Sequence, residues 1–267
     1  MSAPDLPPPP SFDQPKQRPL AVHLHANDVQ PAELRGCVVV VIDAIRASVT
    51  IAQALANGAS KIIPVLTAED ARRAKSDLLV RGAAPSSVLL GGERGGVLID
   101  GFDLDNSPFS YTRERVAGRT IVFTTSNGTA GLLHAREAAE IIVGSFVNVT
   151  AVCNLIASDP RPVHIIACGT RHELSMDDCL PAGAMVEQLL AAGRELVTDD
   201  AARLCLCAWR ACKGDQAYRE KLMQESRGGR NMVRIGLSRD VNLCATPDAI
   251  PVVPLFDASR GEITLAK

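Results

Sequence analysis

The stretch Val38-Val39-Val40-Val41-Ile42-Asp43 decides how this chain of 267 residues folds. Its apolar part is an unbroken run of β-branched residues of strand length, which is typical of a strand buried on both faces of a parallel sheet. The segment from Arg46 to Asn57 has the pattern of a helix, and Gly58 is well placed to end it. The stretch therefore predicts a buried strand that leads directly into a helix.

The same order of strand and helix recurs along the chain. Further strands are predicted at residues 61–65, 87–90, 120–123, 140–144 and 163–167. Thr67 and Asp70 form a capping box for one helix, and other helices are predicted at 130–139 and 175–192. Such units imply right-handed βαβ crossovers and a mostly parallel sheet. The predicted fold class is α/β, in a layered α/β/α arrangement whose carboxyl third is mainly helical from 198 to 236 and ends in a strand near 250–254.

The composition argues against several classes of protein. Hydrophobic residues make up 46% of the chain and charged residues 22%, which is enough apolar material for a large core. The net charge of −2 and the aromatic content of 3% argue against a nucleic-acid partner. No apolar stretch approaches the roughly 20 residues of a membrane span, and no segment resembles a signal peptide. We therefore expect a cytoplasmic protein without a membrane partner, and the sequence leaves open whether it forms a homodimer.

The first residues differ in composition from the rest. Residues 1–19 are dominated by proline, with Pro7 to Pro10 consecutive, which predicts an extended or disordered tail. The folded part is expected over residues 20–267.

Ligands of open α/β sheets bind beyond the carboxyl ends of the strands, so the residues after each strand are the candidates for function. After the first strand, Asp43 is placed to hold magnesium, a hard cation that prefers oxygen ligands. Arg46 could bind phosphate or sulfonate oxygens, and Ser48 supplies a hydroxyl. The alternative is that Asp43 caps the next helix and Arg46 is a surface charge.

A glycine-rich stretch, Gly91 to Gly96, follows the strand at 87–90 and surrounds the charged pair Glu93 and Arg94. Its glycines would let backbone amides approach an anion, although an ordinary surface hairpin explains the stretch equally well. Shortly afterwards, Asn106 is a polar group that can face the site. Ser107 has the position of an N-cap before Pro108.

The residues Thr124 to Thr129 are all small or polar and lie between a strand and a helix. Their hydroxyl and amide groups are typical of a phosphate-binding turn, and the alternative is a simple Ser/Thr cap. The residues proposed to bind the substrate here are Thr125, Asn127, Gly128 and Thr129.

The strand at 163–167 is followed by Arg171, His172, Ser175 and Asp178. Ser175 and Asp178 fit a capping box, and Asp178 is equally a candidate metal ligand. His172 is a possible general acid. Further along, Arg230 and Asp240 add a cation and a carboxylate.

Five of these stretches, in this order, resemble the 2-phosphosulfolactate phosphatase family. They are Ile42 to Ser48, Gly91 to Arg94, Gly101 to Pro108, Thr124 to Thr129 and Asp178 to Gly183. The resemblance runs from about Leu20 to the end. The first stretch reads Asp-Ala-Ile-Arg-Ala-Ser-Val-Thr, where the family pattern is closer to Asp-Val-Leu-Arg-Ala-Thr-Ser-Thr, and Asp105 replaces a usual glycine.

The resemblance implies a magnesium-dependent phosphohydrolase with a fold of two related α/β lobes, here with a boundary near residues 145–160. It implies hydrolysis of 2-phospho-3-sulfolactate to sulfolactate and phosphate, in the route to coenzyme M. In that role, Arg46 and Arg94 would bind phosphate, and Arg171 or Arg230 would meet a carboxylate or sulfonate. The candidates for metal ligation are Asp43, Glu93, Asp178 and Asp240.

Two other functions stay open at this point. One is a phosphatase for a different phosphorylated acid or sugar, and the other is a non-catalytic sensor of anionic metabolites. Several carboxylates beside a phosphate favour an enzyme, because without a metal they would repel the bound anion.

Overall fold

The computed structural model describes residues 18–170, 173–197 and 200–266. Its strands are β1 (Pro19–His23), β2 (Val38–Ile42), β3 (Lys61–Pro64), β4 (Val88–Arg94), β5 (Val97–Leu98), β6 (Thr120–Thr124), β7 (Glu140–Gly144), β8 (Val163–Ala167), β9 (Glu195–Leu196), β10 (Pro254–Asp257) and β11 (Glu262–Leu265). They form one sheet in the order β5-β4-β6-β3-β11-β10-β7-β2-β8-β1-β9. The sheet is mostly parallel, which confirms the predicted class.

The strand β2 lies inside the sheet between β7 and β8, and it pairs with both in parallel. All five of its residues are buried, as the unbroken apolar run predicts. Its alternate side chains enter two different cores. Val40 packs in a cluster that includes Leu180, whereas Val41 packs in a cluster that includes Leu132.

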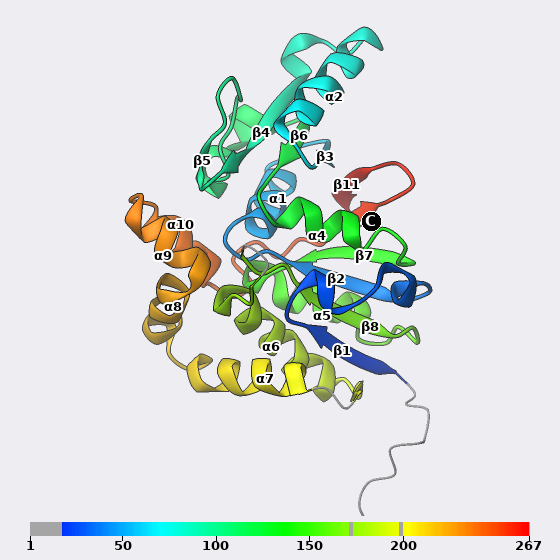
Figure 1. The fold of residues 1–267 in the computed structure, drawn as a ribbon, viewed down its shortest axis with the longest axis vertical. Coiled ribbons are helices and arrows are strands. Elements are labelled where there is room, and N and C mark those ends of the chain that lie inside the picture. The colour runs from blue at the N-terminus through cyan, green and yellow to red at the C-terminus, as the bar shows by residue number, and fades with distance from the viewer. Residues whose placement is uncertain (1–17, 171–172, 198–199, 267) are drawn as a thin grey trace, which may run out of the picture.

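Helices cover both faces of the sheet, so the arrangement is layered α/β/α as predicted (Figure 1). The helices are α1 (Ala47–Ala56), α2 (Ala68–Val80), α3 (Arg113–Val116), α4 (Gly128–His134), α5 (Val149–Ile156), α6 (Met176–Ala191), α7 (Asp200–Cys212), α8 (Gln216–Glu225), α9 (Arg227–Arg234) and α10 (Ser238–Cys244). In Figure 1, α8, α9 and α10 form a group at one side of the sheet. None of the helices in the described part of the chain is long and apolar enough to cross a membrane.

The antiparallel hairpin of β10 and β11 lies between β3 and β7 and joins two parallel parts of the sheet. One part contains β3, β4 and β6, and the other contains β1, β2, β7, β8 and β9. The predicted lobe boundary at residues 145–160 falls between β7 and β8, which flank the same strand β2. Both sides of that boundary therefore contribute to one sheet.

The amino-terminal limit of the fold differs slightly from the prediction. Residues 1–17 of the expected tail lie outside the described residues, but Pro19 already starts β1. Arg18 donates hydrogen bonds to the carbonyl oxygens of Ala157 and Ala192, at 2.7 and 2.5 Å.

The glycine-rich stretch Gly91 to Gly96 belongs to a hairpin, the alternative that the sequence offered: residues 91–94 are the second half of β4, and Gly95 and Gly96 form the turn to β5. Gly91 pairs with Phe123, and Gly92 pairs with Thr124 of β6. A side chain at Gly92, whose φ is +139°, would come within 1.9 Å of the Thr124 carbonyl oxygen. These glycines therefore let two strands approach closely, and this close approach positions the next residue, Glu93.

Candidate active site

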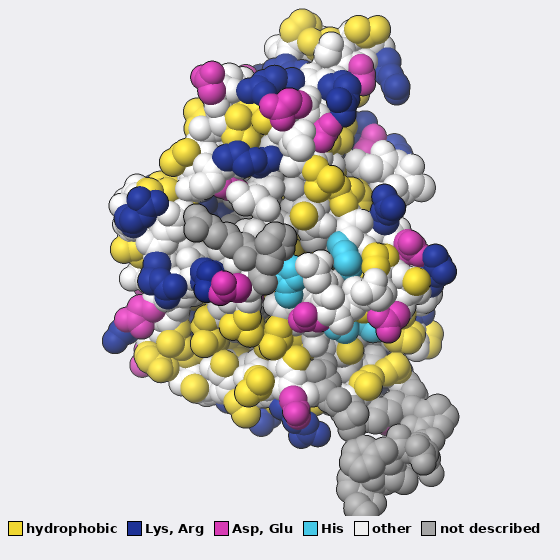
Figure 2. All heavy atoms as spheres, viewed as in Figure 1, with side chains coloured by type: hydrophobic (Ala, Val, Ile, Leu, Met, Phe, Trp, Pro, Cys, Tyr) yellow, Lys and Arg dark blue, Asp and Glu magenta, His cyan; other side chains and the backbone are white. Residues whose placement is uncertain are grey.

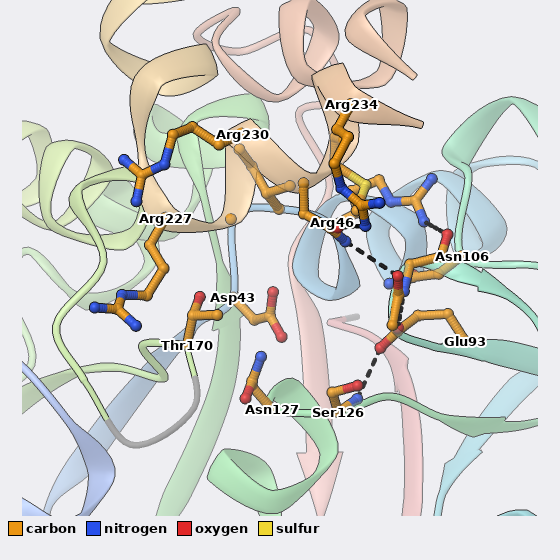
Figure 3. A pocket seen from close by; sticks show the side chains of 16 residues that line it. Asp43, Arg46, Glu93, Asn106, Ser126, Asn127, Thr170, Arg227, Arg230 and Arg234 are labelled. Atoms are coloured by element: carbon orange, nitrogen blue, oxygen red, sulfur yellow. Dashed lines mark hydrogen bonds between the residues drawn. The ribbon is translucent and has the colours of Figure 1, made fainter. Parts of the chain in front are cut away.

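A cavity of about 450 Å³ opens where β2, β4, β6 and β8 end. Its lining comes from distant parts of the chain: Asp43, Ile45, Arg46, Glu93, Gly95, Gly96, Asn106, Ser126, Asn127, Thr170, Arg227, Gly228, Arg230, Asn231, Met232 and Arg234. The strand ends provide one wall and α9 provides the facing wall (Figure 3). The cavity thus lies at the sheet edge where ligands of α/β proteins bind.

Asp43 follows β2 and projects into this cavity, although only 6% of its surface is exposed. Backbone hydrogen bonds from Ala47 and Gly128 stabilise its charged form. Burial opposes them, as do the negative charges of Asp177 and Glu93, and the net effect raises the pKa of Asp43 to about 7. The carboxyl group can therefore accept or release a proton near neutral pH.

Asp178 lies behind Asp43, outside the lining of the cavity. Its two oxygens accept hydrogen bonds from the backbone amides of Ala44 and Gly169, at 2.7 and 2.8 Å. It thereby ties the segment after β2 to the segment after β8. Burial, followed by the charges of Asp177 and Asp43, raises the pKa of Asp178 well above its ordinary value.

The sequence did not single out Asp177, yet the structure places it in the same group. It is buried and accepts hydrogen bonds from Ser175 and Ser226 and from the backbone of Gly228. The predicted capping box of Ser175 and Asp178 is therefore wrong, because Ser175 donates to Asp177 while Asp178 bonds to other loops. We call Asp43, Glu93, Asp177 and Asp178 the acidic cluster.

Glu93 joins the β4–β5 hairpin to the turn after β6. Its carboxylate accepts hydrogen bonds from the backbone amides of Gly96 and Ser126, at 2.7 and 2.8 Å. The sequence pattern predicts that the backbone amides of Gly96 and Ser126 are available to a bound anion. In the structure, both amides donate to the Glu93 carboxylate instead.

Arg46 lines the cavity, but its guanidinium group is almost completely buried and already partnered. It forms an ion pair with Asp240 and donates a hydrogen bond to the carbonyl oxygen of Gly96 at 2.9 Å. The second oxygen of Asp240 accepts from the hydroxyl of Ser107 at 3.0 Å. Asp240 and Ser107 therefore lie behind the cavity wall, and they fix Arg46 in place.

Arg94 lies outside the cavity. Its guanidinium group donates to the Leu66 carbonyl and to the Thr124 hydroxyl, both at 2.8 Å. Because side chains alternate along a strand, Arg94 leaves β4 on the opposite face from Glu93. These contacts join the end of β4 to β6 and to the segment that follows β3.

The turn from Thr124 to Thr129 combines structural and site residues. The side chains of Thr125 and Thr129 bond within the turn, at 3.3 and 3.1 Å. Ser126 and Asn127 line the cavity. Gly128 packs against Asp43, where a Cβ atom would lie 2.7 Å from the Oδ2 atom.

A sequence model described as 2-phosphosulpholactate phosphatase matches residues 23–259. The chain belongs to this family. A protein of Symbiobacterium thermophilum named probable 2-phosphosulfolactate phosphatase is 38% identical over 89% of this chain and 98% of its own length. Proteins with the same name from Thermotoga petrophila and Clostridium perfringens are 37% and 34% identical, over 84% and 91% of this chain and 90% and 94% of their own lengths. Membership confirms the predicted family and, with it, the predicted class of phosphoric monoester hydrolase.

The remaining predicted residues can now be placed in this family member. Ser48 is buried, and its hydroxyl accepts a hydrogen bond from the Asp43 amide at 2.9 Å. Asn106 and Arg230 line the cavity as predicted. Arg171 and His172 lie outside the described residues.

Five cavity residues with polar side chains were absent from the predicted site: Ser126, Thr170, Arg227, Asn231 and Arg234. Three of them belong to α9. The signal that could have found them is the spacing of Arg227, Arg230 and Arg234, since residues three and seven positions apart share one face of a helix. We call these three arginines the α9 wall.

The residues around the cavity suit a magnesium ion. Asp43 and Glu93 offer carboxylate oxygens, and the Oδ1 atom of Asn106 is buried without a hydrogen-bond partner among the described residues. Hard oxygen donors of this kind are the ligands that magnesium prefers. The described residues contain no group of three or more His, Cys, Asp or Glu side chains that could hold a metal.

Proposed function

We propose that this family member is a magnesium-dependent phosphatase that hydrolyses 2-phospho-3-sulfolactate to sulfolactate and phosphate. The observation that carries the proposal is the cavity itself, in which a carboxyl group with a pKa of about 7 lies opposite three arginines. The relatives described above bear this substrate in their names, which supports the choice of phosphoester. The cavity of about 450 Å³ is large enough for a metabolite of this size.

In the proposed reaction, the phosphoryl group lies against the wall formed by the strand ends. The hydroxyl of Ser126 and the side chain of Asn127 donate hydrogen bonds to its oxygens. The buried guanidinium group of Arg46 supplies a fixed positive charge, because Asp240 and Gly96 hold it in one position. A magnesium ion held by Glu93 and the Oδ1 atom of Asn106 would neutralise charge on the phosphoryl oxygens.

Asp43 acts as the general base that accepts a proton from the attacking water, and this proton passes to the alcohol oxygen of sulfolactate when the P–O bond breaks. A base is most effective when its pKa lies close to the working pH, and burial brings Asp43 into that range. Asp178 holds the loops after β2 and β8 around Asp43, and the negative charges of Asp177 and Glu93 help to raise the pKa of Asp43. Glu93 keeps the turn after β6 at the correct distance through its two amide contacts.

The test is the release of phosphate from 2-phosphosulfolactate by the purified chain, with magnesium and after its removal with EDTA. We expect turnover with magnesium, loss of turnover with EDTA and recovery when magnesium is added again. Turnover that is insensitive to EDTA would reject the role of the metal. A panel of other phosphorylated acids and sugars, assayed in parallel, decides the substrate: faster hydrolysis of another member would replace phosphosulfolactate.

A further inference from the structure

The helix α7 presents an apolar stripe to solvent, far from the cavity. Leu204, Cys207 and Ala211 are exposed, and their spacing of three and four residues places them on one face of the helix. The Leu204 side chain is 64% exposed, and Val197, which follows β9, is 42% exposed. Figure 2 shows hydrophobic side chains gathered over the region of α6 and α7. We call Leu204, Cys207 and Ala211 the α7 stripe; an apolar surface of this kind indicates that another segment covers it.

Basic side chains border the α7 stripe on one side. Arg203 and Arg210 are exposed and lie seven positions apart, so they form one edge of the stripe. Arg210 and Lys213 donate to the Glu187 carboxylate of α6, each at 3.0 Å, but the Arg210 side chain is still 57% exposed. The surface is therefore apolar with a positive edge. It suits a segment that combines apolar and acidic side chains.

A segment with this chemistry precedes the first strand of the same chain. Residues 1–17 contain the apolar side chains Leu6 and Phe12, and the charged side chains before Lys16 are Asp5 and Asp13. The prolines of this segment favour the extended polyproline II conformation, which loses little entropy on binding. Its apolar and acidic residues thus match the two features of the α7 surface.

The position of Arg18 directs this segment toward α7. Arg18 donates to the carbonyl oxygen of Ala192 at the end of α6, and its own carbonyl oxygen accepts from the Glu195 amide of β9 at 3.1 Å. The helix α7 begins shortly after β9 and lies against β1, and Figure 1 shows the start of β1 and α7 at the same end of the molecule. An extended chain spans at most about 3.5 Å per residue, so Phe12 can reach about 20 Å from Arg18 and Leu6 about 40 Å. Both can reach the stripe, since a helix of this size is about 20 Å long.

We propose that residues 1–17 pack on the α7 stripe of their own chain. In this arrangement, Leu6 and Phe12 cover the stripe, and Asp5 and Asp13 lie along its positive edge. The apolar contacts supply most of the affinity, because exposed ion pairs contribute little. The covalent connection through Arg18 keeps the segment at a high local concentration, so that weak contacts are sufficient. The inference does not depend on the proposed function.

The thiol of Cys207 can report whether the stripe is covered. It is the exposed cysteine of the chain, because the other seven are buried. A segment that packs on the stripe slows the reaction of this thiol with N-ethylmaleimide, since the reagent must wait until the segment leaves. The rate of alkylation at Cys207 is measured by mass spectrometry on the full chain, at several protein concentrations. Sedimentation velocity gives the oligomeric state of the same samples.

Three full-length variants are compared with the parent chain. The first replaces Leu6 and Phe12 by Gln, and the second replaces Asp5 and Asp13 by Asn. The matched control is Val80→Gln, which removes an exposed apolar side chain from α2. Figure 1 shows α2 at the opposite end of the molecule from α7, so this change leaves the stripe untouched.

We expect the Leu6 and Phe12 variant to be alkylated about tenfold faster than the parent chain, as for a segment that is docked about 90% of the time. The Asp5 and Asp13 variant should react about threefold faster at low salt, and the control should match the parent. Equal rates in the parent chain and in the Leu6 and Phe12 variant would overturn the inference. It would also be overturned if protection rose with protein concentration together with the fraction of dimer, because a second copy would then cover the stripe.

Discussion

The acidic cluster and the α9 wall face each other across one cavity, but they are built in opposite ways. Asp43, Asp177 and Asp178 are buried and bonded to backbone amides or hydroxyls, so their positions are fixed before a ligand arrives. The arginines of α9 are partly exposed: Arg230 and Arg234 bond to residues close by in the sequence, and Arg227 pairs with the exposed side chain of Glu173. Chemistry requires groups fixed in advance, whereas recognition of a polar ligand can use side chains that adjust. Under the proposed function, the first wall carries out the chemistry, and the second wall presents adjustable side chains to the same cavity.

The largest expected difference between the two walls is the fall in kcat when the general base Asp43 is removed. Asp43→Asn should lower kcat by about 10³-fold, since a positioned general base contributes about 10²–10⁴-fold. KM and sulfolactate inhibition should change little, because the α9 wall is intact. Steady-state kinetics on the magnesium-saturated protein measure both. A variant that keeps more than about a tenth of the parent kcat would remove Asp43 from the reaction.

The second effect is a dependence of stability on pH that belongs to the acidic cluster. Because the pKa of Asp43 is raised to about 7, the folded chain binds a proton that the unfolded chain has released above about pH 4. This contribution to stability is complete below that pH and is lost as the pH rises through about 7. The difference in unfolding free energy between Asp43→Asn and the parent chain should therefore grow with pH, by at most about 4 kcal/mol.

Urea unfolding in metal-free buffer at pH 5 and pH 8 measures this change. Asp43 titrates together with Asp177 and Asp178, so the change reports on the acidic cluster as a unit. A difference that is constant between the two pH values would show that Asp43 titrates normally. The matched variant Arg230→Gln on the opposite wall should show no such dependence, because its side chain is exposed.

A third, smaller effect concerns the framework that holds Glu93 in the cluster. Gly92→Ala should destabilise the fold by about 3 kcal/mol, because a Cβ atom there would meet the Thr124 carbonyl at 1.9 Å. Gly118 also has a positive φ, of +72°, but a Cβ atom there would meet nothing within 4 Å. Gly118→Ala should therefore cost only about 1 kcal/mol, the cost of the left-handed conformation. Denaturant titration of both variants measures the contrast, and equal costs would refute the close approach of β4 and β6.

Part of the acidic cluster could be predicted from sequence, because the patterns that indicate it are local. The apolar run before Asp43 defines a buried strand, and the end of a parallel strand defines where a ligand binds. The roles of Asp178 and Asp240 could not be read in this way. Asp178 bonds to amides of two other loops, and Asp240 pairs with Arg46, which lies 194 residues away in the sequence. A local pattern cannot contain such tertiary partners.

The α9 wall was harder to predict for a related reason. The periodicity of Arg227, Arg230 and Arg234 indicates a shared helix face, but it does not indicate what that face meets. The orientation of α9 depends on Asp177, Ser175 and Gly95, which come from other elements. The same limit applies to Arg94. The sequence did not reveal that β4 continues as far as this residue and directs its side chain away from the cavity.

The smallest expected effect is the response of the two walls to salt. The arginines of α9 are exposed, and charges in solvent are screened over about 10 Å at 0.1 M salt and about 3 Å at 1 M. Raising the salt from about 0.05 to 0.5 M should therefore weaken sulfolactate inhibition about threefold, and less in a variant with all three arginines of the α9 wall changed to Gln. The ion pair of Arg46 and Asp240 is buried and scarcely screened, so kcat should stay nearly constant. Sulfolactate inhibition constants and kcat are measured across this salt series. A fall in kcat as steep as the loss of inhibition would mean that the two walls do not act separately.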